Sequence, residues 1–244
     1  SHNHPQVKAT AIRCITTLPP KEMVRQLAPR LTDSVRLVRM AAADALAPVP
    51  PENYKLDELK AFAAAYDELQ ASYLVNSDLA GSHLMLGVLA ERNGNLNAAA
   101  KAYRTAIHVQ PDVAGPRSNL AQLLDRMRDP ESAARYRKEE LPLLKRDAEF
   151  APNIASVQYR YGLSLYLNGQ PDAALPLLER TCELEPENAD YVLALALLNE
   201  RLQRWEAALE GVEAVRQMRP SDASIAPIEQ RLRQIIQAIK QHQQ

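Results

Sequence analysis

A period of 34 residues runs through most of this 244-residue chain and limits the folds that it can adopt. In the stretch from Ala80 to Pro111, Gly87, Ala99 and Tyr103 stand at positions whose counterparts recur along the chain. A repeat of this length is typical of stacked helix pairs, in which each pair buries its apolar face against its neighbours. The counterparts are Leu120, Ala121, Leu124 and Ala133; then Tyr161, Gly162, Leu165, Ala174, Leu178 and Pro186; and finally Leu195, Ala196, Ala208, Val212, Val215 and Pro220.

Each position in the first stretch has a physical reason. Gly87 allows two helices to approach closely, and Leu86 and Tyr103 fill the space between them. Proline cannot donate a backbone hydrogen bond and disfavours helix in the residue before it, so Pro111 ends the second helix. Turn-forming residues at 93–95 predict the connection between the two helices. Further turns are expected at Arg128–Asp129–Pro130, Asn168–Gly169 and Gln203–Arg204.

These residues and their spacing resemble the tetratricopeptide repeat (TPR) family. The resemblance implies an all-α fold, an α-solenoid in which antiparallel helix pairs form a right-handed superhelix. The step from Lys145, which replaces the closing proline of the second unit, to Pro186 is 41 residues. About seven residues are therefore added near 141–152, and we expect the second helix of that unit to be longer than usual. Residues 80–222 then divide into four units, 80–113, 114–147, 155–188 and 189–222.

Residues 1–50 follow a different pattern. The run Val-Lys-Ala-Thr-Ala from Val7 is echoed by Val-Arg-Met-Ala-Ala from Val38, and an Asp-containing turn lies between them. This pattern resembles a HEAT repeat, with one unit at 21–48 and the second helix of another at 5–17. A half unit at the start predicts that the chain is a segment of a longer protein.

The regions that flank the TPR units are expected to be helical as well. Residues 51–79 combine a Pro-rich joint with an alanine-rich helix that matches the second helix of an incomplete TPR unit. Residues 223–244 are expected to form an amphipathic capping helix, with isoleucines and Leu232 on one face. Both segments would cover the open ends of the repeat array, which repeat proteins require for solubility.

Composition agrees with stacked helices and excludes several classes of function. Only 7 Gly and 2 Phe occur, and aromatic residues make up 5% of the chain, which is unlike a sheet protein. The formal net charge of −1 gives no electrostatic reason to expect nucleic acid as a partner. No apolar run is long enough to predict membrane insertion. Cys14 and Cys182 both lie in apolar helical patterns, and we interpret them as two buried thiols rather than a disulfide.

No catalytic or cofactor-binding constellation is found in the sequence. The chain has no Gly-rich phosphate loop, no Cys-x-x-Cys-His haem-attachment sequence, and no Ser or Cys nucleophile with a placed base. The five histidines are scattered. We therefore expect a chain that is not an enzyme, that holds no metal or cofactor, and that binds a protein or peptide through its surface.

The TPR resemblance implies that the first helix of each unit lines a concave groove. Tyr159 and Tyr166 lie two turns apart on one such helix with Arg160 beside them, and Tyr and Arg are common interface anchors. An alternative is that both tyrosines fill the gap made by the added residues, and the sequence leaves both interpretations open. The residues expected to bind the partner are Arg92, Asn119, Gln122, Arg126, Tyr159, Arg160, Tyr166 and Glu200.

Some chaperone-binding TPR proteins grip a terminal carboxylate with five polar groove residues. Asn119 and Arg160 match two of those positions. Leu84, Val88 and Ser156 stand where that carboxylate clamp requires Lys or Asn. The clamp is incomplete, so the sequence argues against a chaperone tail as the partner.

The order of HEAT-like helices, Pro-rich joint, alanine-rich helix and TPR units resembles the C-terminal part of bacterial multihaem cytochrome c-related proteins. This resemblance implies a periplasmic module, with a cytoplasmic location as the alternative. Two functions follow. The first is a scaffold that binds a protein or peptide partner in the TPR groove. The second is an accessory or assembly domain of a larger multihaem cytochrome or other enzyme. The sequence identifies neither the partner nor the oligomeric state.

Overall fold

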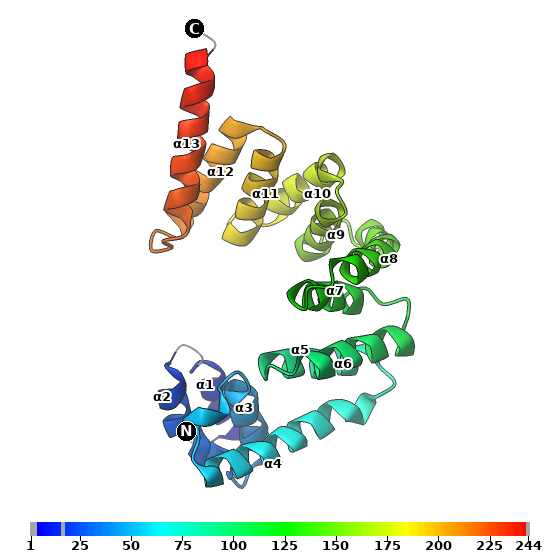
Figure 1. Cartoon of the computed structure of the whole chain (residues 1–244), viewed down its shortest axis with the longest axis vertical. Helices are drawn as coiled ribbons and strands as arrows, with labels where there is room; N and C mark the ends of the chain where they lie inside the picture. The colour runs from blue at the N-terminus through cyan, green and yellow to red at the C-terminus, as the bar shows by residue number, and fades with distance from the viewer. Residues whose placement is uncertain (1–3, 16–17, 243–244) are drawn as a thin grey trace. The chain divides into compact units, whose positions relative to one another are not determined.

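The computed structural model describes residues 4–15 and 18–242, and within these ranges every regular element is a helix (Figure 1). The chain divides into two compact units, Ser1–Ala133 and Ala134–Gln244, and the boundary falls inside α8 (Pro130–Phe150). The remaining α-helices of the first unit are α1 (Pro5–Arg13), α2 (Pro20–Leu27), α3 (Arg36–Leu46), α4 (Leu56–Tyr73), α5 (Ala80–Arg92), α6 (Leu96–Val109) and α7 (Pro116–Arg126). Those of the second are α9 (Ala155–Leu167), α10 (Pro171–Leu184), α11 (Ala189–Arg201), α12 (Trp205–Met218) and α13 (Ile225–His242).

A single apolar cluster holds the N-terminal helices of the first unit together. Its centre is α3, whose small buried residues allow α1 and α4 to pack closely on it. The cluster extends across the Pro-rich segment, where the Tyr54 hydroxyl donates a hydrogen bond of 3.0 Å to the backbone carbonyl of Leu46. The rings of Tyr54, Phe62 and Tyr66 continue the cluster along α4 towards Leu89 of α5, with centroid separations of 5.5 and 5.4 Å. The Pro-rich segment is therefore packed against the core.

Four tight turns separate the two helices of successive pairs. Each contains one residue in the left-handed region, at Gly94 (φ 74°), Arg128 (φ 64°), Gly169 (φ 75°) and Gln203 (φ 60°). These residues are 34, 41 and 34 positions apart, so the same turn recurs in the register that the sequence predicts. Glycine adopts this conformation without steric penalty, whereas a side chain at Arg128 or Gln203 is strained.

The first full helix pair, α5 and α6, packs closely where Gly87 of α5 faces Tyr103 of α6. A Cβ atom added at Gly87 would lie closer than 3.0 Å to three carbons of the Tyr103 ring, which is 1% exposed. In the pair of α11 and α12 the glycine at the contact lies on the second helix, at Gly211, and Ala196 of the first helix stands at the repeat position of Gly87. A Cβ added at Gly211 would lie 2.9 Å from the Cβ of Ala196. Both pairs reach close contact, as the spacing predicts.

The residues added in the second TPR unit, near 141–152, lie mostly within α8. This helix has 21 residues, whereas α6, α10 and α12 each have 14. Pro142 lies inside the helix without ending it. Leu144 and Ala148 are buried, so the apolar stripe continues through the added turns. The domain boundaries expected at 50, 79 and 222 remain predictions.

The last helix, α13, covers α12. Ile225 and Leu232 are fully buried in the cluster that α11, α12 and α13 share, and a capping role for this helix remains a prediction. Glu229 is also buried and accepts hydrogen bonds from Arg216 (2.7 Å) and Arg233 (3.0 and 2.8 Å). These bonds lower the pKa of the Glu229 carboxyl. A buried carboxylate held by two arginines stays charged without leaving its charge uncompensated.

The prediction that both cysteines are buried is wrong for Cys14 and only partly right for Cys182. Both thiols are free, but Cys14 is exposed just after α1, whereas Cys182 of α10 is half-buried. Burial raises the pKa of the Cys182 thiol to about 11. Cys14 follows the last helical residue of α1, where the apolar pattern no longer determines which way a side chain points.

Replacing Gly87 with Ala is expected to destabilise the chain by about 1–3 kcal/mol, because the new methyl group overlaps a ring that is buried on all sides. Equilibrium urea unfolding measures this difference. Gly81→Ala on the same helix is the control, because nothing lies within 4 Å of the added Cβ. In the double variant, replacing the ring by the smaller side chain of leucine with Tyr103→Leu should recover part of the stability lost with Gly87→Ala. A Gly87→Ala protein as stable as the control would contradict the close approach.

Replacing Gln203 with Gly is expected to stabilise the chain by about 0.5–1 kcal/mol, because relief of the left-handed strain exceeds the entropic cost of glycine. Thermal unfolding followed by circular dichroism measures the shift. Gly169→Ala, the same turn one pair earlier, should shift the midpoint in the opposite direction. Equal shifts of the two variants would show that the turn conformation does not govern stability there.

Candidate functional site

A hollow of about 300 Å³ lies between three consecutive helices of the first unit. α5 and α7 are first helices of successive pairs, and α6 contributes one residue between them. Four of the eight residues expected to bind a partner meet here. The lining consists of Val88, Glu91, Arg92, Tyr103, Asn119, Gln122 and Arg126.

The carboxylate of Glu91 joins all three helices at the floor of this hollow. Its Oε1 accepts a hydrogen bond of 2.5 Å from the Tyr103 hydroxyl of α6, and its Oε2 pairs with Arg126 of α7. Burial and the neighbouring Glu91 charge raise the pKa of Tyr103 well above its usual range, so this phenol remains a donor. The Glu91 side chain is only 19% exposed, whereas that of Arg126 is 55% exposed. Arg126 is thus anchored at one end and open to solvent at the other.

Arg92 lines the hollow but is committed to a second contact. Its guanidinium pairs with the Asp44 carboxylate of α3 at 2.5 Å and donates to the Asp44 backbone carbonyl at 2.7 Å. This bidentate arrangement ties α5 to the N-terminal helices. Arg92 therefore serves the packing of the first unit as well as the wall of the hollow.

Asn119 and Gln122 supply the side-chain amides of the hollow. They lie three residues apart on α7, so both amides face the same side of that helix. Gln122 is exposed and Asn119 is half-buried beside the Tyr103 hydroxyl. Each side-chain amide offers both a donor and an acceptor, as a peptide backbone requires.

In the second unit, the structure separates the two predicted tyrosines of α9. Tyr159 is half-buried and its ring lies 4.8 Å from that of Tyr191 on α11, at an angle of 36°. Tyr159 also packs against the apolar cluster of α9, α10 and α11, and burial raises the pKa of its phenol. Tyr166 is 38% exposed. The core interpretation thus fits Tyr159, whereas Tyr166 is available at the surface.

The other two predicted residues of the second unit have different surroundings. Arg160 is exposed on α9. Glu200 of α11 forms a bidentate pair with Arg231 of the capping helix, at 3.1 and 2.8 Å. Glu200 therefore fastens α13 to α11, and its carboxylate is already satisfied.

The structure adds three contributions to those that the sequence predicts. The Tyr103 hydroxyl reaches the hollow, whereas the sequence predicts only a packing role for this residue. Glu91 has a groove-facing position in the TPR register but is not among the residues expected to bind the partner, and it holds both Tyr103 and Arg126. Tyr191 is the ring partner of Tyr159, which the sequence does not predict. The 34-residue period carries a signal for Glu91 and Tyr191, because both occupy first-helix positions of their units, but periodicity does not say which side chains meet.

Across residues 4–15 and 18–242, no group of three His, Cys, Asp or Glu side chains is placed to hold a metal ion. In the same ranges, no helix is both long and apolar enough to cross a membrane.

Comparison with solved structures finds the same fold elsewhere. One is TTC0263, a thermophilic TPR protein in Thermus thermophilus, with a TM-score of 0.54, 20% identity, and coverage of 79% of this chain and 98% of that chain. Another is BtubC (BKLC) from P. vanneervenii, with a TM-score of 0.53, 21% identity, and coverage of 84% of this chain and 92% of that chain. At these identities the likeness shows the fold alone, an α-solenoid. A search of curated proteins found no match.

The family comparison identifies the repeats themselves. The tetratricopeptide repeat model matches residues 84–143 and 159–223, which together make up more than half of the chain. Residues 1–50 lie outside these matches, so their HEAT-like character and the resemblance to multihaem cytochrome c-related proteins remain predictions without support from the comparisons. From the matched ranges and the helix pairs that fill them, the chain belongs to the tetratricopeptide repeat family.

Proposed function

We propose that this chain is a non-enzymatic interaction scaffold that binds an extended segment of a partner protein in the hollow between α5, α6 and α7. The observation that carries the proposal is the meeting of Asn119, Gln122 and Arg126 over the floor formed by Glu91 and Tyr103. TPR domains serve as protein-binding scaffolds, and membership of this family supports the same role here.

The hollow is held in shape before any partner arrives. The close contact of Gly87 with Tyr103 holds α5 against α6, and the Glu91 carboxylate connects both helices to α7. Because the receptor side is already ordered, the entropic cost of binding falls mainly on the partner segment. A rigid wall of this kind suits a flexible peptide.

The spacing of the two amides fits a peptide backbone in extended conformation. Residues three apart on one face of a helix have Cβ atoms roughly 5–6 Å apart. Alternate residues of an extended chain, which present their backbone groups to the same side, are roughly 6.6 Å apart. Asn119 and Gln122 can therefore pair with two such residues of one segment, each through a donor and an acceptor.

Arg126 adds a preference for carbonyl or carboxylate groups at one end of the segment. Its guanidinium has five N–H donors, and the contact with Glu91 leaves part of them facing solvent. The neighbouring charges of Glu91 and Asp44 balance those of Arg126 and Arg92. We therefore expect a segment that is neutral or weakly acidic rather than highly charged.

On the second unit, we place a further contact surface on Arg160 and Tyr166 of α9. Both side chains are exposed, whereas Tyr159 is packed on Tyr191 and Glu200 is paired with Arg231. An aromatic ring and a guanidinium exposed on the same helix are suited to bind a protein surface.

Changing Asn119 and Gln122 together to Ala should weaken peptide binding roughly thirtyfold, because each of the two amides contributes about 1 kcal/mol through its pair of hydrogen bonds. Peptides selected on an array by the unaltered protein are titrated by fluorescence anisotropy against each variant. Lys101→Ala with Arg104→Ala, two exposed residues of α6 outside the hollow, is the matched control and should bind normally. Selected peptides that bind the amide variant as tightly as the control would place the binding site elsewhere.

Changing Arg160 and Tyr166 together to Ala should weaken capture of a selected partner while the thermal midpoint stays unchanged. Tyr159→Ala should instead lower the midpoint, because the ring contact with Tyr191 and the packing against the core are lost, at a cost of about 2–4 kcal/mol. Surface binding and thermal melts on the same samples separate the two effects. Unchanged binding by the Arg160 and Tyr166 variant would remove α9 from the interface.

A further inference from the structure

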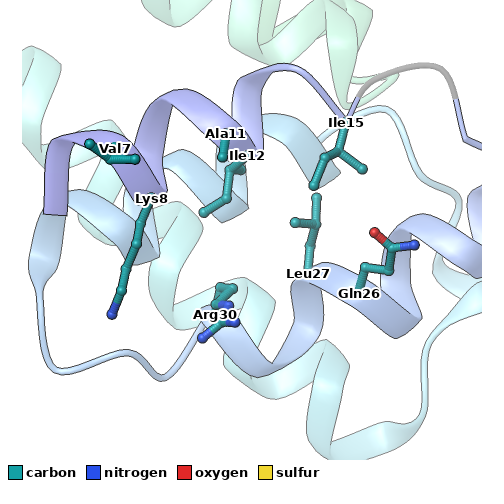
Figure 2. Close-up of a pocket in the computed structure, with 8 residues that line it drawn as sticks. All are labelled: Val7, Lys8, Ala11, Ile12, Ile15, Gln26, Leu27 and Arg30. Atoms are coloured by element: carbon teal, nitrogen blue, oxygen red, sulfur yellow. The ribbon is translucent and has the colours of Figure 1, made fainter. Parts of the chain in front are cut away.

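A second groove lies at the N-terminal end of the first unit, away from the hollow of the proposed function. It has a volume of about 530 Å³ and runs between α1 on one side and α2 with η1 (Ala28–Arg30) on the other. Figure 2 shows Ile15 and Leu27 facing each other across it, with Lys8 and Arg30 towards its other end. The lining consists of Val7, Lys8, Ala11, Ile12, Ile15, Gln26, Leu27 and Arg30.

The walls of this groove are mainly apolar and partly open to solvent. Ile12 and Leu27 are buried and form its floor. Val7 is 51% exposed, Ala11 is exposed and Ile15 is half-buried, so the α1 wall presents an apolar stripe to water. Val7 and Ala11 lie four residues apart on α1, the spacing by which a helix contacts another helix, and Ile15 continues the apolar wall just beyond the end of α1. An open apolar stripe of this kind indicates an interaction surface.

The packing of the other helices indicates what shape fits there. In the pairs α5–α6, α9–α10 and α11–α12, each helix packs along its partner, and neighbouring pairs pack on each other. α1 packs along α3, but it has no such partner on the side that faces α2 among the residues that the structure describes. The space between α1 and α2 is thus the place that a first helix would occupy in a stacked array. This groove is therefore shaped for a helix rather than for an extended strand.

The charge around the groove restricts the partner further. Between residues 4 and 35 the chain carries five basic residues and only two acidic ones, whereas the whole chain has a formal net charge of −1. Both acidic residues already face basic ones, Asp33 at 3.8 Å from Lys8 and Glu22 at 2.7 Å from Arg25. Arg30 lines the groove and forms no ion pair with any residue that the structure describes. The groove therefore offers an uncompensated positive charge beside an apolar stripe.

We infer that this groove binds an amphipathic α-helix of a partner protein whose apolar face lies on Val7, Ala11 and Ile15. Acidic side chains at the border of that face pair with Arg30. The apolar stripe supplies the attraction, and the basic rim selects acidic helices over basic ones.

A synthetic helix tests this inference directly. The probe is a fluorescein-labelled peptide of about four helical turns, with leucines spaced three and four residues apart and with glutamate and alanine elsewhere. A matched peptide carries lysine in place of glutamate. Fluorescence anisotropy should show saturable binding of the acidic peptide and at least roughly tenfold weaker binding of the basic one.

Two variants examine the two walls, and both change exposed residues so that folding is retained. Arg30→Glu should weaken the acidic peptide roughly tenfold and strengthen the basic one. Ala11→Glu should abolish binding of both, because it places a charge on the apolar stripe. Lys60→Glu on α4 makes the same change in net charge outside the groove and should bind like the unaltered protein. Circular dichroism verifies that each variant is helical.

Three results would overturn the inference. One is the absence of saturable binding by the acidic peptide. Another is equal binding by the Arg30→Glu and Lys60→Glu proteins, which would show that net charge alone attracts the peptide. The third is capture by vesicles of phosphatidylserine and phosphatidylcholine, lost with Arg30→Glu, without any preference between the two peptides. That result would assign the basic groove to a lipid surface.

Discussion

The contact of the Tyr103 ring with Gly87 determines more than the packing of one helix pair. Because position 87 has no side chain, the ring approaches the backbone of α5 closely and its hydroxyl donates a hydrogen bond to Glu91 of the same helix. Glu91 in turn holds Arg126 on α7. A packing residue therefore sets the position of the charged groups that line the hollow. The site depends on the absence of one methyl group, which explains why fold and function are hard to separate in this unit.

The repeats reach the same close packing by different residues. In the first full pair a glycine on the first helix receives a tyrosine from the second, whereas in the last pair Gly211 on the second helix receives Ala196 from the first. What the repeat preserves is the distance between helices and the left-handed turn that joins them. Side chains that do not take part in this packing can differ from one repeat to the next. They are polar on α7, with Asn119 and Gln122, and aromatic on α9, with Tyr159 and Tyr166.

The helix pairs could be predicted from the sequence because they depend on local properties. Gly87, Tyr103 and the turn at Gly94 each have a steric reason that is visible within one period. The site was predicted in part. Asn119, Gln122 and Arg126 do line one hollow, but the pairing of Arg92 with Asp44 and of Glu200 with Arg231 joins residues 48 and 31 positions apart. No periodicity reports such pairs, because they depend on which long side chains reach across neighbouring helices. The two tyrosines of α9 illustrate the same limit, since only the position of Tyr191 decides that Tyr159 is packed and Tyr166 is open.

The length of α8 has a consequence for how a chain of this kind can change. Seven residues make up nearly two complete helical turns, so they lengthen the helix by about 10 Å and rotate its end by only about 20°. The face that buries Leu144 and Ala148 therefore continues the face of Ala133, and the following helix starts from the orientation that it would have had without the extra turns. An addition of five residues would have rotated that start by more than a third of a turn and carried polar side chains into the core. Repeat helices can thus grow in steps of seven residues while their apolar face is kept, and the exposed side of the added turns becomes new surface on which a partner can be recognised.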